Sequence, residues 1–195
     1  MTRDAAIIWE QLQTGNEHYV LGTPEYPHQD GARRESLASG QHPDAAVLSC
    51  ADSRVAPELL FDCGLGDMFV VRIAGNIVTD EVLGSLEYAV AVLEVPLLIV
   101  LGHTCCGAVT AAVEQHETPG HIGSLTTNIN QALEGLDLSG DGRMQTAICA
   151  NVQDGVDRLQ NSEPILAPLV QAGTLTVMGA FYDVATGRVT AIDEG

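Results

Sequence analysis

The sequence predicts an α/β fold: a mainly parallel central sheet with helices on both faces, a C-terminal antiparallel edge strand and an N-terminal helical arm. Three observations indicate it. Short apolar runs alternate with amphipathic stretches through the first two thirds of the chain, which is the order of βαβ units. The first of these runs lacks polar alternation, as expected of a strand buried on both faces. Near the C-terminus, a glycine-containing turn joins two β-rich segments and indicates a hairpin.

Length and composition are those of a compact folded chain. The 195 residues are 46% hydrophobic and 17% charged, without internal repeats or low-complexity segments, so residues 1–195 are expected to form one domain. The net charge is −18, and all 8 basic residues are arginines. Such an acidic surface argues against nucleic acid and membranes as partners, and an anionic substrate or product would need local positive charge at its site.

Membrane and secretion signals are not visible in the sequence. The longest apolar stretch, Ala89–Gly102, is interrupted by Glu94 and Pro96 and is shorter than the ~20 residues of a membrane span. The first residues lack the apolar core of a signal peptide. The 5 cysteines have no spacing typical of a disulfide scaffold. We therefore expect a cytoplasmic protein.

Residues 1–44 are expected to form the N-terminal helical arm and loop. Residues 4–21 carry apolar side chains, including Trp9, at helical spacing among polar ones. This helix could pack on a partner subunit or on its own domain, and the sequence favours neither. Residues 22–44 are rich in glycine and proline and indicate a loop with a short helix near 32–39.

Strands and helices then alternate. Three apolar runs have the length of buried strands: residues 45–50, 68–73 and 97–101. Pro57 suits the first turn of a short helix that reaches residue 61. Thr79 precedes two acidic residues, which is typical of a helix N-cap, and we expect Pro96 to end that helix.

The last third of the chain completes the sheet. Helices are expected over residues 107–115, 142–160 and 164–171, whereas residues 116–141 mix helix signals with glycine and proline. A β-rich run covers residues 174–182, and a turn at 183–187 leads to an edge strand at 188–192.

Three reactive side chains follow the first apolar run. Cys50, Asp52 and Arg54 occupy alternate positions, which in an extended or tightly turned backbone project to the same side. Open α/β sheets bind ligands at the carboxyl ends of their strands. An Asp and an Arg two residues apart are usually solvated surface charges, but their place directly after a buried strand favours a functional site.

A second reactive group follows the third apolar run. His103 and Cys106 come after it, and together with Cys50 they offer the thiolate and imidazole ligands that zinc prefers. Either motif alone would be weak, because cysteine is often a buried core residue. Three protein ligands leave one position open for water, as catalytic zinc needs. Cys63 and Cys149 are interpreted as small buried apolar side chains.

The combined pattern resembles the β-class carbonic anhydrases. Cys50-Ala51-Asp52-Ser53-Arg54, followed by His-x-x-Cys-Gly at residues 103–107, is similar to the motif pair of that family. Similar segments extend over most of the chain: Gln41–Pro43, residues 69–76, residues 84–90 and residues 179–187. The resemblance implies reversible hydration of carbon dioxide to bicarbonate and a proton, with Zn²⁺ as cofactor and zinc-bound hydroxide as the nucleophile.

The resemblance also implies a role for each site residue. The zinc ligands are Cys50, His103 and Cys106. The Asp52–Arg54 dyad orients the hydroxide or, when the pair breaks, lets Asp52 close the open zinc position. The pocket for carbon dioxide and bicarbonate is formed by Gln41, Phe69, Ala74, Tyr88 and the backbone of Gly107. Two thiolates and a neutral imidazole leave zinc with little net charge, so we expect activity to rise at alkaline pH.

Some features of the sequence leave alternatives open. Ala74 stands where plant members have valine, and Cys105 lies beside Cys106, where it could compete for metal. A relative that hydrolyses carbon disulfide or carbonyl sulfide would use the same zinc ligands. A non-catalytic zinc protein that binds bicarbonate would not need Gln41, Asp52 and Arg54. The resemblance further implies a homodimer or homotetramer, with Gln41 near a subunit interface.

Overall fold

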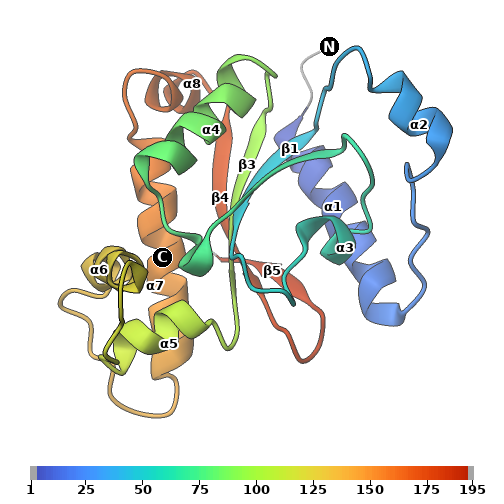
Figure 1. Cartoon of the computed structure of the whole chain (residues 1–195). Coiled ribbons are helices and arrows are strands. Elements are labelled where there is room, and N and C mark those ends of the chain that lie inside the picture. The colour runs from blue at the N-terminus through green and yellow to red at the C-terminus, as the bar shows by residue number, and fades with distance from the viewer. Residues whose placement is uncertain (1–3, 193–195) are drawn as a thin grey trace.

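The centre of the molecule is a five-stranded sheet with the strand order β2-β1-β3-β4-β5. The computed structural model describes residues 4–192. The strands are β1 (Ala45–Ser49), β2 (Met68–Arg72), β3 (Leu97–His103), β4 (Thr176–Tyr182) and β5 (Val189–Ala191). The first four run parallel and β5 pairs antiparallel with β4 (Figure 1). The predicted mainly parallel sheet with an antiparallel edge strand is confirmed.

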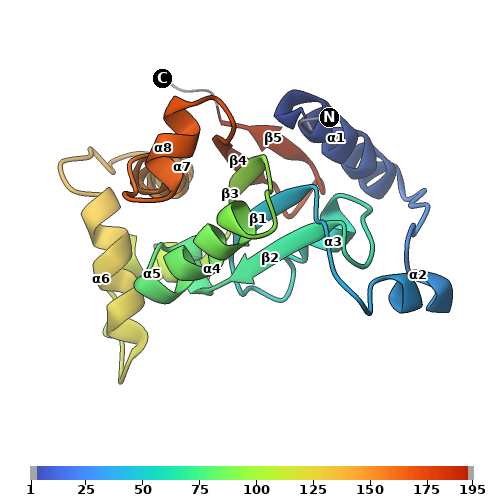
Figure 2. The same ribbon diagram turned by 90° about the horizontal axis from the view of Figure 1, so that it is seen from above.

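Helices cover both faces of this sheet (Figure 2). On one face, side chains of α4 (Asp80–Ala91), α7 (Arg143–Gln160) and α8 (Leu166–Gln171) pack on the sheet. On the other face lie α1 (Ala5–Leu21) and α3 (Pro57–Leu60). Strand β1 supplies side chains to both layers, and all five of its residues are buried, which explains its continuous apolar sequence.

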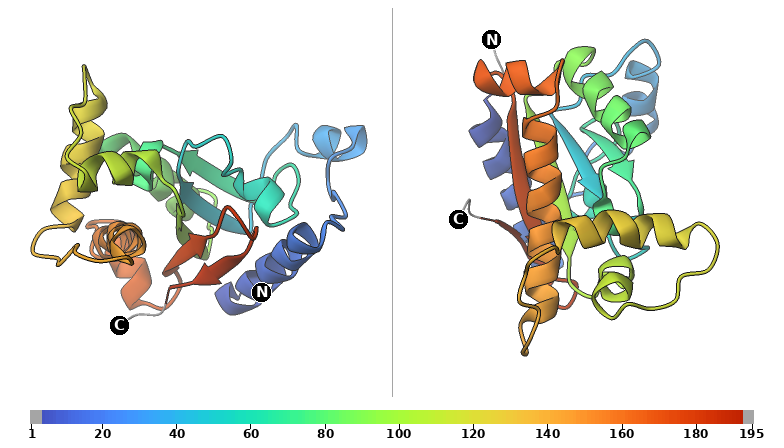
Figure 3. Two further views of the ribbon diagram at one scale, coloured as in Figure 1. Left: turned by 90° about the horizontal axis from the view of Figure 1, so that it is seen from below. Right: turned by 90° about the vertical axis from the view of Figure 1, so that its left-hand side faces the viewer.

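A third hydrophobic cluster lies past the carboxyl ends of the strands. It joins α5 (Gly107–Val113) and α6 (Ile122–Ala132) to the start of α7 (Figures 1 and 3). The cluster includes Cys50 and Cys106. Helix α6 occupies part of the region where the sequence signals were mixed. The two cysteines therefore lie where the sheet meets an apolar helical layer.

Most predicted boundaries agree with the structure to within a few residues, with one clear exception. Thr79 caps α4, but the helix ends at Ala91 and not at Pro96. Glu94 adopts a left-handed φ of 56°, and the amide of Val95 donates back to the carbonyl of Ala89. The chain thus turns before the proline, which immediately precedes β3.

The N-terminal helix packs on its own domain. Ile8 and Leu12 of α1 are buried against the sheet, and the ring of Trp9 meets that of Phe61 edge to face with centroids 6.2 Å apart. The short helix α2 (Gly31–Ser36) has no buried residue. Residues 22–42 lie mostly at the surface.

A loop before β2 fastens the arm to the body. The carboxylate of Asp62 accepts hydrogen bonds from the amides of Glu25 and Tyr26, and that of Asp67 binds His28 and Arg33. The short connection to β2 thus holds the arm beside the sheet.

Within residues 4–192, no helix is long and apolar enough to cross a membrane.

Candidate metal centre

Three buried side chains converge at the carboxyl ends of the adjacent strands β1 and β3. Cys50 directly follows β1, His103 is the last residue of β3, and Cys106 precedes α5. One ligand atom from each lies within 4.8 Å of the others, and the two Sγ atoms are 4.0 Å apart. The parallel register, in which Ser49 pairs with Leu101, aligns the two strand ends and explains the convergence.

The imidazole of His103 is oriented for a ligand. Its Nδ1 lies 2.9 Å from the carbonyl oxygen of Thr104. Because a carbonyl can only accept, Nδ1 carries the hydrogen and Nε2 keeps its lone pair. Nε2 is buried and has no hydrogen-bond partner among the described residues. An unpaired buried nitrogen beside two thiols is costly unless it binds something, so the donor set fits a zinc ion.

The thiols of Cys50 and Cys106 share a hydrogen bond, and each changes the pKa of the other. A hydrogen bond from the Cys106 thiol lowers the pKa of the Cys50 thiol. Hydrogen bonds from His103 and from the backbone amides of Gly75 and Asp52 lower it as well. These amides lie 3.3 and 3.4 Å from Cys50 Sγ. The pKa of Cys106 is raised by its hydrogen bond to Cys50 and by burial. One thiolate therefore forms readily, and a bound cation would favour loss of the second proton.

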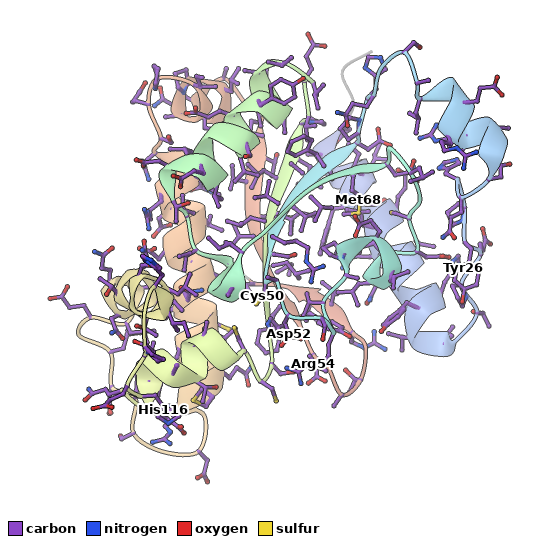
Figure 4. The ribbon with its side chains drawn as sticks, viewed as in Figure 1. Tyr26, Cys50, Asp52, Arg54, Met68 and His116 are labelled. Carbon is purple, nitrogen blue, oxygen red and sulfur yellow. The ribbon has the colours of Figure 1, made fainter. Side chains whose placement is uncertain are left out.

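Asp52 and Arg54 form a bidentate ion pair. Arg54 Nε lies 3.0 Å from Asp52 Oδ1 and Arg54 Nη2 lies 2.7 Å from Oδ2. The backbone amide of Arg54 also donates to Oδ1, and Nη2 reaches the carbonyl of Cys105 at 3.2 Å. The hydrogen bonds from Arg54 hold the pKa of Asp52 well below its usual range. Figure 4 shows Cys50, Asp52 and Arg54 in succession at this edge of the sheet.

Comparisons with known proteins agree with this arrangement. A family model described as carbonic anhydrase matches residues 45–189. The chain belongs to the β-carbonic anhydrase family. It is 43% identical to a carbonic anhydrase of Mycolicibacterium smegmatis, over 93% of this chain and 90% of the relative. It is 41% identical to carbonic anhydrase 2 of Mycobacterium tuberculosis, over 95% and 91%.

Solved structures described as β-carbonic anhydrases share this fold. A tetrameric β-carbonic anhydrase structure from Sordaria macrospora superposes with a TM-score of 0.76 at 26% identity, covering 96% of this chain and 97% of that one. The β-carbonic anhydrase interpretation of the sequence is thus confirmed at the level of family and fold. The alternatives of a carbon disulfide hydrolase or a non-catalytic zinc protein gain no support from these relatives.

The residues expected to line a β-carbonic anhydrase pocket fall into two groups. Ala74 opens the short 3-10 helix η1 (Ala74–Asn76), whose next residue donates to Cys50, and Gly107 follows Cys106, so both border the metal ligands. The remaining three, Gln41, Phe69 and Tyr88, lie elsewhere in the fold.

Gln41, Phe69 and Tyr88 lie toward the amino ends of the strands. Phe69 pairs in register with Ala46, four residues before Cys50, which is ~13 Å back along β1. The rings of Phe69 and Tyr88 are 6.2 Å apart, and Gln41 lines a separate groove before β1. Figure 4 shows Met68, at the amino end of β2, well away from Cys50.

Sequence reasoning missed two residues that support the site. Arg72 binds the backbone carbonyls of Cys50 and Asp52, and Asn151 of α7 donates to the carbonyl of Gly75 at 2.9 Å. The available signal for Arg72 was a charged residue at the end of an otherwise apolar strand. No local signal singled out Asn151, because its partner is 76 positions away.

Two other cysteines differ from expectation. Cys63 and Cys149 are partly exposed and not fully buried. Cys63 Sγ lies 3.4 Å from the carbonyl of Phe61, and Cys149 lines an open groove on α7. Cys63 lies in the loop after α3 and Cys149 lies within α7, and the linear sequence does not reveal how far either side chain is covered. Cys105 is exposed and has a left-handed φ of 58°, which turns the chain between His103 and Cys106.

Proposed function

We propose that this protein catalyses the reversible hydration of carbon dioxide to bicarbonate and a proton, with zinc held by Cys50, His103 and Cys106. The observation that carries the proposal is the buried convergence of these three donors, with His103 Nε2 unpaired, in a member of the β-carbonic anhydrase family. Cys50, His103 and Cys106 would hold the zinc ion, which when bound there would supply an acidified water as the nucleophile for carbon dioxide.

Asp52 and Arg54 are proposed to control how that water is used. Arg54 keeps Asp52 ionised, so the carboxylate accepts a hydrogen bond and does not store the proton that hydration releases. An accepting carboxylate fixes the orientation of a neighbouring O–H group. The intact bidentate pair supports a site in which Asp52 is turned to Arg54 and leaves the fourth ligand position open. If the pair broke, the carboxylate could occupy that position.

The divided pocket supports a homo-oligomer. Gln41, Phe69 and Tyr88 are too far along the sheet to serve the metal ligands of their own chain, and 48% of Tyr88 is exposed. We infer that they face the metal centre of a second copy, where Gln41 would donate to a substrate oxygen and the two rings would form an apolar wall. The Sordaria macrospora relative is tetrameric, which agrees with assembly through more than one interface.

Stopped-flow carbon dioxide hydration, measured together with zinc content, tests the proposal. The expected result is one zinc per chain, hydration that rises from neutral to alkaline pH, and loss of both zinc and activity in Cys50→Ser. Cys149→Ser is the matched control, because it removes a partly buried thiol outside the site. A zinc-loaded wild type without hydration activity at any pH between 7 and 9 would refute the proposed reaction.

A further inference from the structure

Arg72 contacts the turn that carries two of the functional side chains. Its Nε donates to the carbonyl oxygen of Cys50 at 3.0 Å, and its Nη2 donates to that of Asp52 at 2.6 Å. Arg72 is the last residue of β2 and pairs in register with Ser49, the last residue of β1. The guanidinium therefore lies beside the point where the chain leaves β1.

The geometry of this contact matches the shape of a guanidinium. Two backbone carbonyls, two residues apart, are bound by two nitrogens of one rigid planar group. A lysine ammonium cannot reproduce this fork, because it is a point charge on a flexible stem. The contact therefore fixes the direction of the backbone at Cys50 and at Asp52 together.

Both clamped residues depend on that backbone direction for their function. The Cys50 Sγ must stay within ligand distance of His103 and Cys106, and the Asp52 carboxylate must stay on Arg54. Arg72 also places a positive charge beside the backbone of Cys50 and Asp52, in a chain whose net charge is −18.

We propose that Arg72 is a positioning residue that clamps the Cys50–Asp52 turn and thereby maintains the geometry of the metal site. The proposal rests on the proposed role of Cys50 as a metal ligand, but it does not depend on which reaction the site performs. The hydrogen bonds of Arg72 go to backbone carbonyls and not to the side-chain atoms that would bind the metal. Its effect is therefore expected at the metal, through Cys50.

Metal affinity provides a readout that is independent of catalysis. We would measure the zinc dissociation constant of the full chain by competition with a chromophoric chelator, for Arg72→Gln, Arg72→Lys and the control Arg158→Gln. Arg158 is a partly exposed residue of α7 whose contact is an ion pair to Asp154 at 3.7 Å, so it loses the same charge away from the site. The visible spectrum of the cobalt-substituted proteins reports the ligand geometry of the same site.

The expected result is a zinc affinity roughly 10- to 100-fold weaker in Arg72→Gln, as is typical when groups that orient metal ligands are removed. Its cobalt spectrum should change, Arg72→Lys should recover only part of the affinity, and Arg158→Gln should match wild type. Wild-type zinc affinity and an unchanged cobalt spectrum in Arg72→Gln would overturn the proposal.

A folding defect would not leave the question open. If Arg72→Gln fails to fold, Arg72→Lys decides: weaker zinc binding supports the bidentate clamp, and wild-type binding overturns it. A wild type that binds zinc but does not hydrate carbon dioxide would refute the proposed function alone. A loss of zinc affinity in Arg72→Gln would still support the clamp in that case.

Discussion

Gly75 provides a sharp test of how the metal site is supported. Its amide donates to Cys50 Sγ at 3.3 Å, and its φ is +76°. A Cβ at this position would lie 2.8 Å from Ile129 Cδ1 and 3.1 Å from Ala108 Cβ. Gly75→Ala would therefore force an alanine into the left-handed conformation. Its methyl group would also clash with Ala108 of α5 and Ile129 of α6.

The two costs can be estimated separately. A non-glycine residue in the left-handed region costs ~1–2 kcal/mol. Overpacking a well-filled core costs a further ~1–3 kcal/mol. Gly22→Ala is the matched control, because Gly22 also has a left-handed φ of 68° but nothing lies within 4 Å of its Cβ position. The stabilising loss of backbone freedom in the unfolded chain is the same for both variants and cancels in the difference.

Denaturant unfolding of the metal-free proteins measures this difference, since bound zinc would otherwise add its own linkage term. We expect the free energy of unfolding of Gly75→Ala to lie ~1–3 kcal/mol below that of Gly22→Ala, which is the overpacking term alone. We also expect Gly75→Ala to bind zinc more weakly, because its amide turns away from Cys50. Equal stability of the two variants, with unchanged zinc binding in Gly75→Ala, would refute this description of the site.

Three further predictions concern charge and thiol chemistry. Arg54→Gln should lower kcat/KM for carbon dioxide hydration roughly 10- to 100-fold while zinc content stays at wild-type level, as measured by stopped flow; an unchanged rate would contradict the role given to Asp52. Burial and nearby carboxylates raise the pKa of Cys63 to about 12 from an ordinary value of 9.0, so its contribution to stability is complete below pH 9 and falls as pH rises toward 12. Denaturation midpoints at pH 8 and 10.5 should therefore drop less in Cys63→Ala than in wild type, and equal drops would argue against this protonation linkage. In the zinc-loaded protein, iodoacetamide should modify the exposed Cys105 before Cys63, as read by peptide mass spectrometry; the reverse order would contradict the exposures found here.

The sheet was predictable because its signals are local. The fully buried β1 and β3 read as continuous apolar runs, and Thr79 marked the start of α4 through its own side chain. The end of α4 was not predictable from Pro96, because the chain turns earlier at Glu94. Where the chain turns depends on how α4 and the following strand β3 pack in the folded protein, which a local sequence pattern does not reveal.

The candidate site was predictable to a similar degree. The motif of Cys50, Asp52 and Arg54 is local in sequence. It directly follows β1, which is adjacent to β3, the strand that ends in His103. The support from Asn151 and Arg72 depends on contacts between distant segments and could not be read from spacing. The separation of Phe69 and Tyr88 from the metal ligands likewise follows only from the register of β2 on β1.

Zinc titration of the metal-free protein tests the central claim most directly. Carbon dioxide hydration should rise linearly with added zinc and reach its limit at one zinc per chain, and Cys50→Ser should show no such rise. Hydration that does not depend on zinc, or zinc that binds at one per chain without restoring hydration, would contradict the account.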